Sequence, residues 1–196
     1  MRGNADRILV ELRRDPDASN PVPIAPWAAA RLRDDQVALL DGLPTSVTFD
    51  LPGFGRTLFC HATPRDDAEM VLVDSRLERW AEVFAGLDAE VRTVVCGHTH
   101  MPFARLVHRR LVVNPGSVGM PYGVTGAHWA LLDDGAVTLR VTPYDIPAAC
   151  ARIATTSGYP DAAAWAEEYL TSRNSDIDAL RAFGPADGRP LRPPSG

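Results

Sequence analysis

Apolar and polar positions along the chain predict a mixture of strands and helices. The predicted strands are the apolar or alternating runs at 46–50, 57–60, 91–96, 110–114, 128–132 and 137–141. The predicted helices, where apolar residues recur at helical spacing, span 34–41, 75–90, 147–155 and a last segment from 161. Because strands and helices interleave and Asp-Asp-Gly at 133–135 marks a hairpin, we expect an α/β fold with mixed sheets.

The two ends of the chain carry weaker signals. Gly3 and Asn4 form a common turn pair, and the prolines at 21, 23 and 26 are expected to break any regular element. From Gly184 onward the composition is rich in Gly, Pro and Arg. We therefore expect one domain over 1–183 and a disordered tail over 184–196.

Three of the five histidines follow predicted strands. His98 and His100 lie in Gly-His-Thr-His directly after the run at 91–96, and His61 follows the run at 57–60. The carboxyl ends of strands in open α/β sheets form the edge where ligands bind. A divalent metal is the simplest group that would hold three imidazoles together at that edge.

Charge and composition exclude several function classes. The net charge of −5, without a basic cluster, argues against binding of nucleic acid or of an anionic membrane. All 20 basic residues are arginine, which indicates a GC-rich bacterial genome and excludes lysine chemistry. No apolar run is long enough to cross a bilayer, and the first residues carry no signal-peptide pattern. We expect a cytoplasmic protein.

The three cysteines are widely spaced and odd in number, so a disulfide framework is not expected. A structural zinc site that uses Cys60 or Cys96 with the histidines is an alternative. It is disfavoured because Cys60 and His61 are neighbours on a strand and should point to opposite faces.

Two segments have two interpretations each. Asn4 fits an ordinary turn, yet its amide oxygen could also bind a metal. Asn-Pro-Gly-Ser-Val-Gly at 114–119 suggests a phosphate loop but lacks the required lysine and glycine spacing. A tight turn that brings backbone close to the site is the preferred interpretation of that second segment.

Four motifs together resemble the calcineurin-like metallophosphoesterases, in particular their small bacterial phosphodiesterases. They are Arg-Gly-Asn-Ala-Asp at 2–6, Cys-His-Ala-Thr-Pro at 60–64, Gly-His-Thr-His-Met-Pro at 97–102 and Asn-Pro-Gly-Ser-Val-Gly at 114–119. The resemblance implies a four-layer αββα sandwich. It also implies hydrolysis of small phosphoesters, in particular phosphodiesters, by a hydroxide held between two divalent metals.

The resemblance also assigns roles to single residues. Asn4, His61 and His98 would ligate one metal and carry the chemistry, and His100 would ligate the other. Asp6 is a further candidate, which would orient a neighbour rather than bind metal. Mn²⁺ is the first expectation for the metal, with Fe, Zn and Ni as alternatives.

The sequence departs from the family pattern at two points. The family's Asp-x-His and Gly-Asp motifs do not occur, so we expect a domain that is incomplete at its N-terminus. Ala5 stands where many relatives carry a histidine that assists the leaving group, which favours substrates with good leaving groups. The alternative function is a non-catalytic binding or regulatory module with at most one weakly held metal.

Overall fold

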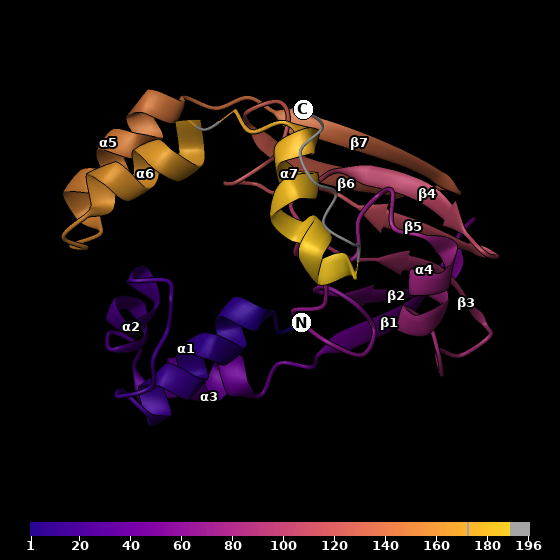
Figure 1. Cartoon of the computed structure of the whole chain (residues 1–196), viewed down its shortest axis with the longest axis horizontal. Helices are drawn as coiled ribbons and strands as arrows, with labels where there is room; N and C mark the ends of the chain where they lie inside the picture. Colours follow the sequence, from indigo (N-terminus) through magenta and orange to yellow (C-terminus); the bar gives the residue numbers. More distant parts are fainter. Residues whose placement is uncertain (172, 189–196) are drawn as a thin grey trace.

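The computed structural model describes residues 1–171 and 173–188. Its centre is a mixed five-stranded sheet with the strand order β1-β2-β3-β5-β4 (Figure 1). β1 and β4 run antiparallel to their neighbours, whereas β2, β3 and β5 are parallel. The strands are β1 (Ser46–Leu51), β2 (Gly55–Cys60), β3 (Val91–Val95), β4 (Phe103–Val107) and β5 (Arg110–Asn114). The predicted α/β class with a mixed sheet is confirmed.

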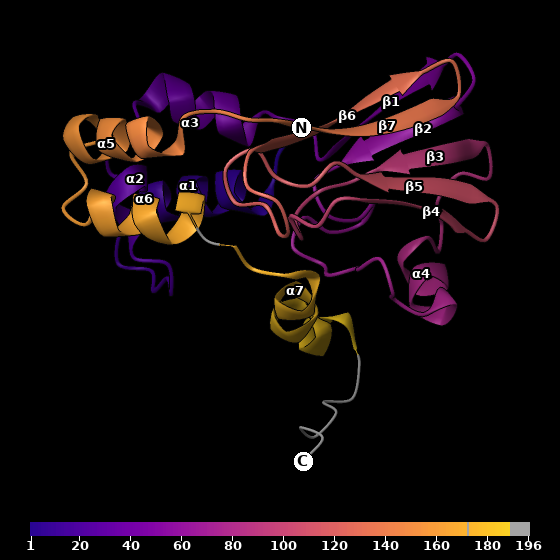
Figure 2. The same ribbon diagram turned by 90° about the horizontal axis from the view of Figure 1, so that it is seen from above.

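Helix α4 (Leu77–Val83) covers one face of this sheet, and the hairpin of β6 (Ala127–Asp133) and β7 (Ala136–Thr142) lies on the other (Figures 1 and 2). Trp80 of α4 is 1% exposed and belongs to the same apolar cluster as Leu58 and Val94. Alternation along β2 and β3 sends these side chains to the α4 face. The main core therefore lies between the sheet and α4.

The β6–β7 hairpin is less well covered. Leu139 and Val141 are each 40% exposed, although their strand partners Ala130 and His128 are partly or fully buried. At its tip the hairpin meets the β1–β2 turn, where Gly53 and Gly135 approach backbone to backbone. Both glycines have a positive φ and no room for a side chain, which explains why glycine occupies both turns.

Most of the remaining helices lie beside one end of the sheet, whereas α7 lies apart from them (Figures 1 and 2). α1 contacts α2 and α3, and α5 packs on α6. The two groups meet where the rings of Trp27 and Tyr159 lie 5.3 Å apart. These helices are α1 (Asn4–Arg14), α2 (Ile24–Ala29), α3 (Asp34–Asp41), α5 (Ile146–Thr156), α6 (Ala162–Thr171) and α7 (Asp176–Phe183), followed by the 3-10 turn η1 (Gly184–Asp187).

Several elements differ from the sequence expectation. Gly3 and Asn4 open helix α1, because the Asp6 carboxylate accepts a hydrogen bond from the Gly3 N–H at 2.8 Å and caps it. Pro26 lies within α2 rather than breaking it. α4 ends well before residue 90, because the chain turns at Gly86 with φ +81°. β4 and α7 were not expected at all.

The predicted tail begins with an ordered turn. Residues 184–187 form η1, and the Asp187 side chain is buried against Ser75. The rest of the predicted tail, 189–196, lies outside the described residues. Among the helices of the described residues, none has the length and apolar character needed to span a membrane.

Candidate functional site

Parallel pairing of β2 and β3 brings two predicted histidines together. Phe59 pairs with Val95, so the chains that leave both strands run side by side. The N–H of Gly97 donates to the carbonyl of His61 at 2.7 Å. As a result the imidazole rings of His61 and His98 lie edge to face, with their centroids 5.2 Å apart.

Asn4 joins this pair from the first turn of α1. Its Oδ1 lies 2.9 Å from Nε2 of His61. Because an amide oxygen only accepts, Nε2 carries the proton in this contact. Gly3 packs directly against the other side of the same ring. Three predicted site residues, from three separate segments, thus meet at one end of the sheet.

The turn after β3 holds its two histidines in an uncommon backbone conformation. His98 has φ +64° and His100 has φ +57°, in the left-handed region that non-glycine residues rarely adopt. Nε2 of His98 lies 3.1 Å from the carbonyl oxygen of Ala68. Nε2 must therefore be the donor, which leaves the lone pair on Nδ1 free.

His100 is held separately. Its side chain hydrogen-bonds to the backbone of Met120. Burial, and to a lesser degree charge on His61, lower the pKa of His100. Among residues 1–171 and 173–188, no group of three or more His, Cys, Asp or Glu side chains lies close enough to hold a metal ion. The structure thus brings Asn4, His61 and His98 together and places His100 at the side of this group.

Burial favours the neutral form of these imidazoles. It lowers the pKa of His61 against the opposing effect of the Asp6 and Asp67 carboxylates. It also lowers the pKa of His98 and of His100. A neutral imidazole has a free lone pair, which is the form that binds metals.

Asn114 is a supporting residue that the sequence analysis did not single out. It is 1% exposed, and its Nδ2 donates to the Gly97 carbonyl at 2.8 Å and to Thr99 Oγ1 at 3.2 Å. Its Oδ1 accepts from the Gly116 N–H at 2.9 Å. The Asn-Pro-Gly-Ser segment is therefore a turn whose first side chain fixes the turn that carries His98.

Comparison with known proteins identifies the family. Residues 1–134 match the model of the calcineurin-like phosphoesterase superfamily domain, which covers more than half of the chain. The chain belongs to this superfamily. Its members hydrolyse phosphoesters. No curated protein matches the chain.

Two solved structures share the fold of this chain. A hypothetical protein from Pyrococcus horikoshii OT3 is 18% identical, with a TM-score of 0.67 over 88% of this chain and 73% of that one. A metallophosphoesterase from Sphaerobacter thermophilus is 21% identical, with a TM-score of 0.59 over 84% of this chain and 74% of that one. At these identities the likeness concerns the fold.

The two strand cysteines do not lie with the histidines. Cys60 and Cys96 are 1% and 4% exposed and belong to the apolar cluster under α4. Burial raises the pKa of Cys96 to about 12 and raises that of Cys60 as well. Such thiols are poor metal ligands, which argues against the structural zinc alternative.

A cavity of about 210 Å³ opens beside His61. His61, Thr45 and the loop residues 63–67 line it. Asp67 in this loop is held by Arg7, whose Nε and Nη2 donate to its carboxylate at 2.9 Å each. The wall of the cavity is thus polar and tied to α1.

The donor set fits a divalent metal. Asn4 Oδ1 contacts His61 Nε2, the His61 and His98 rings lie edge to face, and such N and O donors suit Mn, Fe, Zn or Ni. A metal would take the place of the proton that Nε2 of His61 shares with Asn4. Asp6 is not among these donors, because its carboxylate caps α1.

Proposed function

We propose that this chain is a metal-dependent phosphoesterase that acts on phosphodiesters, with Asn4, His61 and His98 as ligands of one divalent metal. The observation that carries the proposal is the meeting of these three side chains at the ends of β2 and β3 and the start of α1. His100 would serve a second metal, as the family resemblance implies. Mn²⁺ is the first choice for both.

The chain's own residues prepare the donors. The Ala68 carbonyl fixes the tautomer of His98, so that Nδ1 presents its lone pair. Asn4 and Gly3 confine the His61 ring from two sides. When bound, the metal would supply Lewis acidity toward the phosphate and a nucleophile at neutral pH.

The residue beside Asn4 bears on substrate choice. Ala5 cannot donate a proton to a leaving group, so esters of acidic alcohols or phenols should react best. The cavity next to His61 offers polar contacts to the ester's second substituent. An aryl phosphodiester is therefore the probe of choice.

The test is hydrolysis of bis(p-nitrophenyl) phosphate with Mn²⁺. We expect turnover by the wild type and a larger loss in His98→Ala than the roughly 10- to 100-fold that is typical of residues that only orient metal ligands. His108→Ala is the matched control, since His108 contacts the Leu77 carbonyl away from the site. A wild-type rate no higher than that of Mn²⁺ alone would refute the proposal.

One observation favours a second candidate function. Because the described residues gather no three His, Cys, Asp or Glu around one point, the chain could hold at most one metal weakly and bind phosphoesters without turnover. Calorimetry with Mn²⁺ and a non-hydrolysable phosphonate diester separates the two functions. Binding with no turnover supports the binding module.

A further inference from the structure

The last described residues of the chain contact two loops near the candidate site, the loop after β5 and the loop after β2. Residues 174–187 lie outside the family match, which ends at residue 134. The carbonyl of Asn174 accepts a hydrogen bond from Gly123 at 2.7 Å, and the Phe183 ring lies 5.9 Å from that of Tyr122. These contacts hold the loop that follows β5, next to His100. In both views α7 lies across the loop region rather than with α5 and α6 (Figures 1 and 2).

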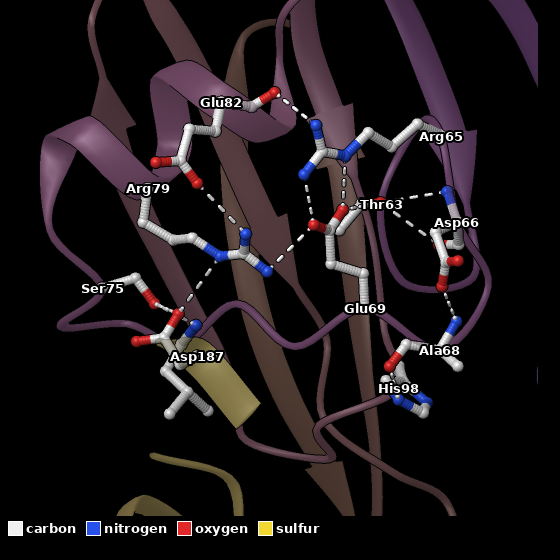
Figure 3. Close-up of polar contacts among 11 residues, drawn as sticks. Thr63, Arg65, Asp66, Ala68, Glu69, Ser75, Arg79, Glu82, His98 and Asp187 are labelled. Atoms are coloured by element: carbon white, nitrogen blue, oxygen red, sulfur yellow. Dashed lines mark hydrogen bonds and ion pairs between the residues drawn. The ribbon is translucent and has the colours of Figure 1, made fainter. Parts of the chain in front are cut away.

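The 3-10 turn after α7 reaches the loop that follows β2. Asp187 is 2% exposed, and its Oδ1 accepts a hydrogen bond from Ser75 Oγ at 2.7 Å. The same oxygen lies 4.0 Å from Nε of Arg79 in α4 (Figure 3). A buried carboxylate needs such partners, so this turn is anchored in the core rather than resting on the surface.

Arg79 connects Asp187 to Glu69 in the loop after β2. Its Nη2 lies 2.9 Å from Oε1 of Glu69, whose side chain is 12% exposed. Glu69 also accepts hydrogen bonds from Arg65 Nε at 2.9 Å and from Thr63 Oγ1 at 2.8 Å (Figure 3). Arg79 thus joins two largely buried carboxylates, while Arg65 and Glu82 flank them at the exposed edge. We call these five side chains the Glu69–Asp187 network.

The loop held by this network supplies the partner of His98. Asp66 closes it from within, because its carbonyl accepts from the Thr63 N–H at 3.0 Å and its Oδ1 from the Ala68 N–H at 2.7 Å. Ala68 then presents its carbonyl to Nε2 of His98 at 3.1 Å (Figure 3). The position of that carbonyl therefore depends on where Glu69, the next residue, is held.

We propose that the turn at 184–187 is a positioning element for His98: Asp187 acts through Arg79 and Glu69 to hold the Ala68 carbonyl against Nε2 of the imidazole. This rests on the role given to His98 under the proposed function. Asp187 does not touch the metal site and acts only through the loop. Loss of its charge leaves Arg79 with Glu69 and the more exposed Glu82 as its carboxylate partners. Arg79 is then no longer held from the side of the 3-10 turn, which allows Glu69 and Ala68 to shift.

The test is Asp187→Asn, which keeps the acceptor for Ser75 and removes the charge that faces Arg79. Asp176→Asn is the matched control, because it makes the same charge change on an exposed residue of the same segment. The first readout is the ¹⁵N NMR spectrum of the histidine rings in metal-free protein. We expect a single Nε2–H tautomer for His98 in the wild type and in the control, and a mixture of tautomers in Asp187→Asn.

The second readout is calorimetric Mn²⁺ affinity, which should fall about tenfold in Asp187→Asn, as for other groups that orient a metal-bound histidine. Glu69→Gln breaks the same network at its other end. It should give the same tautomer mixture, and the double variant should show little further loss. If Asp187→Asn does not fold, Glu69→Gln carries the test alone.

The proposal is overturned if the folded variants keep the wild-type His98 spectrum, whatever their Mn²⁺ affinity. Because the NMR readout needs neither metal nor turnover, it stands apart from the test of the proposed function. A wild type that hydrolyses nothing but shows the tautomer change in Asp187→Asn would refute only the activity.

Discussion

Gly3 lies so close to His61 that a Cβ built on it would stand 2.8 Å from the imidazole Nδ1. Its φ of −102° is open to any residue, so space rather than backbone conformation requires glycine here. The glycine that begins α1 therefore sets the position of the His61 ring.

Gly3→Ala tests this contact. We expect the added methyl group to displace the His61 ring, to weaken Mn²⁺ binding and to lower the free energy of unfolding by about 1–3 kcal/mol, as for other overpacked sites. Calorimetry and urea denaturation measure the two effects. Gly119→Ala, with open space around it, should change neither. Equal Mn²⁺ affinity in Gly3→Ala and the wild type would contradict the prediction.

The side chain of Asn114 should matter for stability as much as for the site. In Asn114→Ala the Gly97 carbonyl, Thr99 Oγ1 and the Gly116 N–H all lose a partner. We expect a loss of about 2–3 kcal/mol in the free energy of unfolding, because buried polar groups are left unpaired. Asn114→Asp keeps the acceptor for Gly116, but its second oxygen would face the Gly97 carbonyl in a buried site, so it should lose at least as much. A loss below about 0.5 kcal/mol in Asn114→Ala would show that these hydrogen bonds are replaced.

Acid should weaken the fold through Asp67. Its hydrogen bonds from Arg7 hold the pKa of the carboxyl below its ordinary value of about 3.9. The unfolded chain therefore binds the proton more readily. The stabilisation is present above that ordinary value and is lost as the pH falls through the lower, folded-state pKa.

Urea denaturation between pH 6 and pH 3 measures this dependence. We expect Asp67→Asn to be less stable than the wild type at pH 6 and to lose less stability on acidification. Asp17→Asn, an exposed substitution, should follow the wild type. Parallel curves for Asp67→Asn and the wild type would rule out this role of Asp67.

The cysteines should differ in reactivity. Cys60 and Cys96 are buried, and burial raises the pKa of both thiols. Cys150 is half-buried on α5. We therefore expect a disulfide reagent such as DTNB to titrate at most one thiol in the native protein at pH 7.5, and all three in urea. Cys150→Ser should leave the native protein without a fast-reacting thiol.

The sequence predicts best where the signal is local. The run at 91–96 and the Asp-Asp-Gly turn indicate β3 and the β6–β7 hairpin, and both form as expected. α7 was missed although Ser175 and Asp178 form a capping box at its start and Ile177, Leu180 and Phe183 recur at helical spacing. The helix has only eight residues and adjoins the Gly-, Pro- and Arg-rich segment from 184, which obscures its short periodic pattern. β4 was missed because Arg105 interrupts its apolar pattern.

Some residues of the candidate site can likewise be predicted from local sequence, and others cannot. The histidines at the strand ends can be predicted from the sequence, because the apolar run at 57–60 is followed by His61 and the run at 91–96 by Gly97 and His98. The groups that hold these histidines in place cannot be predicted in this way. Ser75 and Asp187 are 112 residues apart in the chain, and no local pattern connects them. The Ala68 carbonyl is backbone, so its residue type carries no signal at all.

The sparse covering of the β6–β7 hairpin has a consequence for motion. Leu139 and Val141 leave much of their apolar surface in water, so the hairpin depends mainly on its own ladder of hydrogen bonds. Its opening therefore takes less free energy than unfolding of the sheet under α4. In amide hydrogen exchange β6 and β7 should form a separate, faster-exchanging unit. The hairpin would then open locally on the face opposite α4, while β2 and β3, which lead to His61 and His98, remain folded.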